Sequence, residues 1–166
     1  MPQPSDPVLL LAGATNEPVR YTELPLQGRE LLRLMRMFIA ARLDYAQVAR
    51  PASAVVPNFS RAIAILTCHL LLEVSRTSTR RLLVAGPCHA AITEDELLML
   101  AATDLAQTRD PRLPDLLARL CAVSEDSPEL APVLAATRKL GEALLQEGQR
   151  IAACHLLPPG KLPAIH

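Results

Sequence analysis

Leucine and alanine supply most of the apolar residues of this chain, and they recur at spacings of three and four along several segments. This spacing places apolar side chains together on one face of a helix. Only 2% of the residues are aromatic and tryptophan is absent, so the aromatic side chains that strands favour are scarce. The sequence therefore predicts an all-α fold, a single-domain bundle of about five helices packed in two layers.

Prolines and polar turns separate the expected helices. These span residues 28–48, 59–74, 94–107, 111–123 and 133–155. The second is apolar nearly all round, which is typical of a helix in the middle of a fold. The third begins at a capping box formed by Thr93 and Glu96. Gly141 and Gly148 lie on one face of the last helix, where they allow a close helix contact, unless Gly148 simply ends the helix.

Two short apolar runs flank Gly86-Pro87 between the second and third expected helices. A Gly-Pro turn between such runs is compatible with a small β-hairpin over residues 81–92. An irregular loop fits the same residues nearly as well, so the sequence leaves both structures open.

Proline also marks both ends of the chain. Five prolines in residues 1–27 prevent a regular helix, so we expect an N-terminal arm that is either disordered or extended over the body or over a partner subunit. The apolar run Val8–Leu11 favours the extended form. Residues 28–156 form the helical domain, and residues 157–166, which contain three prolines, form a C-terminal tail.

Charge is balanced, with 17 basic and 17 acidic residues, but it is unevenly distributed. Arginines dominate the first half, and acidic residues dominate the stretch that follows it. We expect the two regions to face each other, within one molecule or across a dimer. The neutral net charge argues against a nucleic-acid-binding protein.

No apolar run reaches the roughly 18 residues that a membrane span needs. No basic residue precedes Arg20, so the apolar run near the start is a poor signal peptide. We therefore expect a cytoplasmic protein whose cysteines are reduced.

Three of the four cysteines are followed directly by a histidine, at Cys68-His69, Cys88-His89 and Cys154-His155. Both side chains ligate transition metals such as zinc. The local spacings that mark zinc sites, Cys-x-x-Cys or His-x₃₋₅-His, are absent. A metal site would have to combine distant residues, for which the candidates are Cys88, His89, Cys154 and His155.

Each pair also has an ordinary structural explanation. His69 lies one helical turn before Glu73, which suits a hydrogen bond. Cys88 lies in a loop near a helix start, which favours a reactive thiol, but the acidic residues there oppose this effect. A merely packed or exposed cysteine is the ordinary explanation. A histidine such as His155 is favoured at a helix C-terminus when charged. No cofactor is favoured by the sequence.

Arg29, Arg33 and Arg36 share one side of the first expected helix, opposite its apolar face. They are candidates for contact with an anion or a partner, and a solvated face is the alternative. Neither a glycine-rich phosphate loop nor a Gly-x-Ser-x-Gly motif occurs. The sequence favours a non-enzymatic helical module for protein–protein interaction or regulation, which self-associates. A metal- or cofactor-binding helical protein with Cys/His ligands is the alternative.

Overall fold

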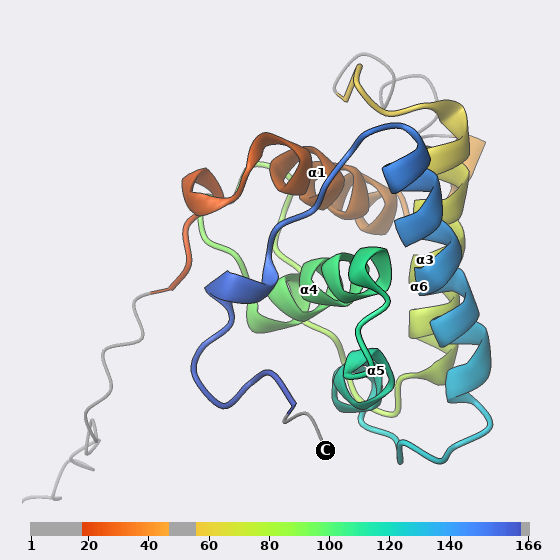
Figure 1. Cartoon of the computed structure of the whole chain (residues 1–166). Helices are drawn as coiled ribbons and strands as arrows, with labels where there is room; N and C mark the ends of the chain where they lie inside the picture. The colour runs from red at the N-terminus through yellow and green to blue at the C-terminus, as the bar shows by residue number, and fades with distance from the viewer. Residues whose placement is uncertain (1–17, 47–55, 164–166) are drawn as a thin grey trace, which may run out of the picture.

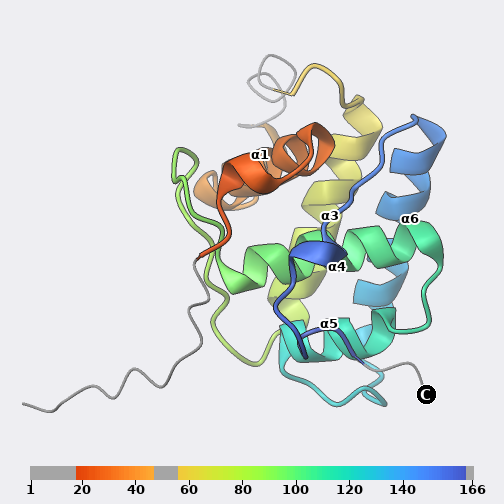
Figure 2. The same cartoon turned by 60° about the vertical axis from the view of Figure 1, so that its left-hand side comes forward.

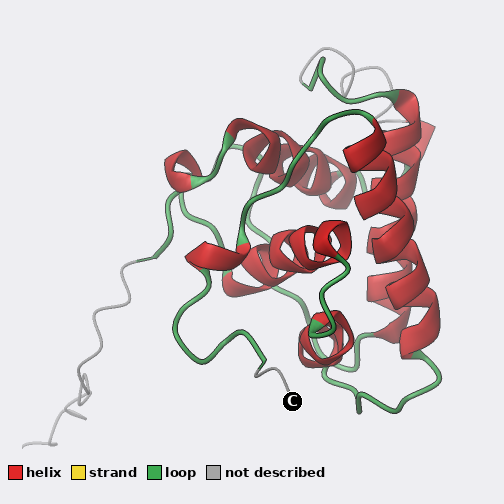
Figure 3. Ribbon diagram, in the orientation of Figure 1, coloured by secondary structure: helices red, strands yellow, loops and turns green. Residues whose placement is uncertain are grey.

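The computed structural model describes residues 18–46 and 56–163. Its α-helices are α1 (Leu26–Ala40), α3 (Arg61–Thr77), α4 (Glu94–Thr108), α5 (Leu113–Cys121) and α6 (Leu130–Gln146). Two short 3-10 helices, η1 (Tyr21–Glu23) and η2 (Cys154–Leu156), lie near the two ends of the described chain. The described residues form no strand (Figure 3). The predicted all-α fold of about five helices is confirmed.

The helices pack in two layers. Helices α3 and α6 run alongside each other, and α1, α4 and α5 are stacked one beyond another against that pair (Figures 1 and 2). Leucines dominate the space between the layers. Residues with no exposed surface include Leu31, Leu34, Phe38, Ile63, Leu100, Leu116, Val133, Leu140 and Leu144.

Side-chain caps define two of the helix starts. At α3 the Ser60 hydroxyl accepts a hydrogen bond of 3.3 Å from the backbone N–H of Ile63. At α4 the Thr93 hydroxyl accepts from the Glu96 N–H at 3.2 Å, and a Glu96 carboxylate oxygen accepts from the Thr93 N–H at 2.8 Å. The capping box predicted at residues 93–96 is confirmed.

Two helices end earlier than the sequence suggested. The first was expected to reach residue 48 but ends at Ala40, because Arg42 and Leu43 adopt left-handed φ angles of 55° and 61°. The last was expected to reach His155 but ends at Gln146. Gly148, with φ 72°, follows that end, so the alternative that Gly148 ends the helix is the correct one.

Residues 81–92 form an irregular connection, not a hairpin. An isolated antiparallel bridge instead joins Ala91 to Arg20. The expectation that the helix at 59–74 lies in the middle of the fold is also wrong. α3 is an outer helix, since Ile65 is 47% exposed and His69 is also exposed.

Candidate protein-binding groove

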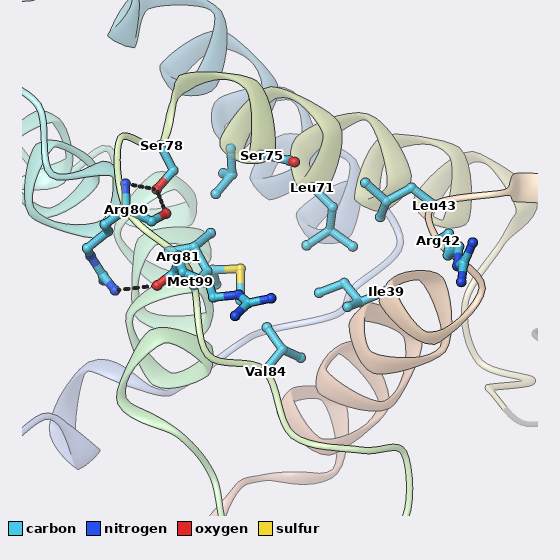
Figure 4. Close-up of a pocket in the computed structure, with 12 residues that line it drawn as sticks. Ile39, Arg42, Leu43, Leu71, Ser75, Ser78, Arg80, Arg81, Val84 and Met99 are labelled. Atoms are coloured by element: carbon cyan, nitrogen blue, oxygen red, sulfur yellow. Dashed lines mark hydrogen bonds between the residues drawn. The ribbon is translucent and has the colours of Figure 1, made fainter.

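An open groove of about 460 Å³ lies between the end of α1, the second half of α3 and the segment 78–84 (Figure 4). Most of its lining is apolar. The apolar lining residues are Ile39, Leu43, Leu71, Val74, Leu82, Val84 and Met99. The volume is in the range of pockets that bind small molecules or a few side chains.

The end of α1 forms one wall of the groove. Here the chain reverses through Arg42 and Leu43, and the Leu43 N–H donates to the carbonyl of Phe38 at 2.6 Å. The Cys68 thiol of α3 lies 3.7 Å from the Leu43 carbonyl, to which it donates. These contacts hold the turn against α3, with the Leu43 side chain facing the groove (Figure 4).

The opposite wall is fixed by the first acidic residues of α4. Arg80 forms a two-pronged ion pair with Asp95, with one bond of 3.0 Å to Oδ2. The same Asp95 oxygen accepts a hydrogen bond of 2.7 Å from the Leu83 N–H. Burial raises the pKa of the Asp95 carboxyl, but these bonds outweigh it and hold the pKa below its usual value.

A buried ion pair between Arg36 and Glu96 holds the loop that follows the segment 78–84. Arg36 donates from Nε to Glu96 Oε1 at 2.7 Å and from Nη2 to Oε2 at 2.9 Å. It also donates to the loop carbonyls of His89 at 2.6 Å and Ala91 at 2.8 Å. Glu96 Oε1 in turn accepts from the Ala85 N–H at 3.0 Å. Both carboxylate oxygens of Glu96 and four guanidinium hydrogens of Arg36 form hydrogen bonds. The pair therefore has a structural role, which is to hold the loop.

Two arginines bring positive charge to the groove. Figure 4 shows Arg42 beside Leu43 and Arg81 beside Met99, on opposite sides of Ile39 and Leu71. Arg80 also lines the groove, beyond Arg81, but it is paired with Asp95. Neither guanidinium forms an ion pair with a carboxylate of the described residues. Among the described residues, the lining also includes Ser75 and Ser78 but no histidine, cysteine or carboxylate. The groove therefore offers apolar contact together with unpaired positive charge.

The arginines predicted on α1 separate in the structure. Arg33 is exposed, and Arg29 is half-buried. Arg36 is only 1% exposed, so its expected place on an outward face is wrong. The loop of residues 85–92 covers that side of α1, and Arg36 is already bound by Glu96 and by loop carbonyls.

The four metal-ligand candidates occupy different surroundings. Cys88 and His89 are exposed in the loop, where the His89 ring contacts the backbone of Ala91. The Cys154 thiol donates to the carbonyl of Ala101 at 3.5 Å, and burial raises its pKa to about 12. His155 is exposed in η2. Within residues 18–46 and 56–163, no group of three His, Cys, Asp or Glu residues is arranged to hold a metal ion.

The remaining Cys-His pair, Cys68-His69, lies on α3, where His69 is close to Glu73 as the spacing predicted. Cys68 is buried, and His69 Nε2 lies 3.5 Å from Glu73 Oε1. All four cysteines of the chain are free.

Sequence reasoning did not find Arg42 and Arg81 as a pair. Arg81 directly precedes an apolar run, Leu82 to Ala85, which is the signal that marks the groove wall. The sequence around Arg42 carries no such signal, because the first helix was expected to continue past this residue. Only the reversal after Ala40 brings Arg42 to the groove.

No known protein family, curated protein or solved structure matches this chain. Among the described helices, none is long and apolar enough to cross a membrane.

Proposed function

We propose that this protein is a non-enzymatic helical interaction module that self-associates, and that the groove binds a segment of the partner. The observation that supports this proposal is an apolar floor between Arg42 and Arg81, neither of which forms an ion pair with a carboxylate of the described residues. The matching ligand is an apolar stretch of protein with acidic residues on both sides, because opposite charges at the ends of an interface set its register.

Arginine suits this role because its guanidinium is weakly hydrated and presents several donors to a carboxylate. Arginine is also enriched at protein–protein interfaces. Arg42 and Arg81 are exposed and line the groove, so they are available to an incoming segment. The apolar floor supplies the contact area, and the two charges supply specificity.

The metal-binding alternative receives no supporting group of ligands from the described residues, and we do not propose it. Cytoplasmic localisation remains part of the proposal, since the free cysteines fit a reducing compartment.

Light scattering on the purified full chain tests the proposal. We expect a mass that rises with concentration toward twice the 18.0 kDa of one chain. Reversing the groove charges with Arg42→Glu and Arg81→Glu should weaken association by at least about tenfold, because like charges placed against each other repel.

The matched control reverses two exposed arginines that do not line the groove, with Arg138→Glu and Arg150→Glu. It carries the same change in net charge, and we expect less than about a twofold effect on association. A single-chain mass at every concentration, or equal weakening by the control, would contradict the proposal.

A further inference from the structure

We infer that the segment bound in the groove is residues 6–17 of a second copy of this chain, so that two molecules exchange their N-terminal arms. The inference rests on the proposed function and names the partner of the same groove. Residues 6–17 lie outside the described residues. Their sequence and the position at which the described chain begins support the inference.

The sequence of this arm complements the groove. Its apolar run, Val8 to Ala12, lies between two acidic residues, Asp6 and Glu17. The groove has the reverse arrangement of charge, with an apolar floor between Arg42 and Arg81. No basic residue occurs in the chain before Arg20, so nothing in the arm would repel the two arginines.

Backbone hydrogen bonds fix the position at which the N-terminal arm leaves the helical domain. Tyr21 N–H donates to the Ala90 carbonyl at 2.8 Å, and Ile92 N–H donates to the Val19 carbonyl at 3.0 Å. The arm therefore leaves the body beside the loop whose earlier residues form a groove wall.

The direction of departure favours a second molecule over the same one. Traced back from η1 to Pro18, the backbone runs away from α1 and α3, which border the groove (Figures 1 and 2). The seven peptide steps from Leu11 to Pro18 can span at most about 25 Å, which is the reach that the apolar run has from the body of its own molecule. A two-fold arrangement lets each arm fill the other molecule's groove, so the contact forms twice.

Two complementary variants of the full chain test the exchange. One reverses the arm charges with Asp6→Lys and Glu17→Lys, and the other reverses the groove charges with Arg42→Glu and Arg81→Glu. Each variant alone should associate at least about tenfold more weakly than the unchanged chain, because its own arms and grooves carry like charge. Mixed in equal amounts, they should form a dimer, because each arm then meets a groove of opposite charge.

A third variant tests the apolar contact independently. Leu10→Ala in the full chain should also weaken association by about tenfold, because it removes apolar side-chain contact with the floor of the groove without changing any charge. Circular dichroism and thermal melting confirm that each variant is folded, and light scattering reports the mass of each sample and of the mixture.

The outcomes separate this inference from the proposed function. If the groove variant loses association but the arm variant keeps it, the groove binds another segment, and the inference fails alone. If each variant loses association but the mixture stays monomeric, the arms do not exchange, and the inference also fails. If the unchanged chain is monomeric at every concentration, both proposals fail.

Discussion

The single residues that hold the loop after the groove wall are charged and buried. Arg36 and Glu96 have side chains with no exposed surface, and between them they bind the loop at Ala85, His89 and Ala91. Moving two charges out of water costs several kcal/mol each, which good geometry and full hydrogen bonding offset. Removal of one charge leaves the other unpaired in the interior.

Glu96→Gln should therefore be severely destabilising. The amide keeps the size of the carboxylate but leaves Arg36 without its counter-charge, and one oxygen acceptor becomes a donor. We expect a loss of about 3–5 kcal/mol in the free energy of unfolding, measured by urea denaturation. The control Glu125→Gln, at an exposed turn, should change it by less than about 0.5 kcal/mol. A loss below about 1 kcal/mol for Glu96→Gln would show that the pair does not hold the loop.

Sequence reasoning could identify Glu96 as a capping residue because the capping box is local. It could not identify Arg36 as buried. Helical periodicity places Arg36 on the polar side of α1, and that prediction is correct for Arg33, which is exposed. The difference arises because a loop more than 50 residues away in sequence covers one part of this side.

At the scale of the elements, helices α4 and α6 come into close contact at a glycine, Gly141. A Cβ atom at Gly141 would lie 2.9 Å from the Ala106 Cβ and 3.2 Å from the Gln107 backbone nitrogen. The sequence indicated a close approach at this face, with Gly148 as a helix end as the alternative for that residue. The structure shows that Gly141 has the first role and Gly148 the second.

Gly141→Ala should lower the stability of the fold. Alanine is favoured by about 1 kcal/mol in a helix, but overpacking costs about 1–3 kcal/mol, and here it acts on backbone atoms that move only if α4 moves. We expect a net loss of about 1 kcal/mol by urea denaturation. The control Gly86→Ala meets nothing within 4 Å and should be neutral or slightly stabilising. Greater stability for Gly141→Ala would contradict this packing.

At the scale of the whole molecule, two ion pairs among the described residues join the basic first half to the acidic region after it. These pairs are Arg36 with Glu96 and Arg80 with Asp95. A local pair adds to them, since the side-chain hydrogen bond from Arg112 holds the pKa of Asp110 below its usual value. The pKa of Asp95 is also lowered. The folded protein therefore favours the ionised form of both side chains, Asp95 and Asp110.

Acid should remove the contribution that these ionised carboxylates make to the stability of the fold. A carboxyl whose pKa is lower in the folded than in the unfolded state stabilises the fold above the unfolded pKa of about 3.9. The contribution is lost as the pH falls from there through the lowered folded pKa. Asp95→Asn should therefore reduce stability at pH 7 and much less at pH 3, measured by urea midpoints. The control Asp126→Asn, at an exposed position, should cost little at either pH. An equal loss from Asp95→Asn at both pH values would contradict the ion-pair explanation.

The sequence alone determined the helical class, the number of helices and the capped start of α4, because periodicity and capping depend on residues within one or two turns. It also indicated the close approach at Gly141. The tertiary structure decided where α1 reverses, that α3 lies on the outside, and that Arg42 and Arg81 border one groove. These features depend on contacts between residues far apart in the chain, for which local spacing carries no information.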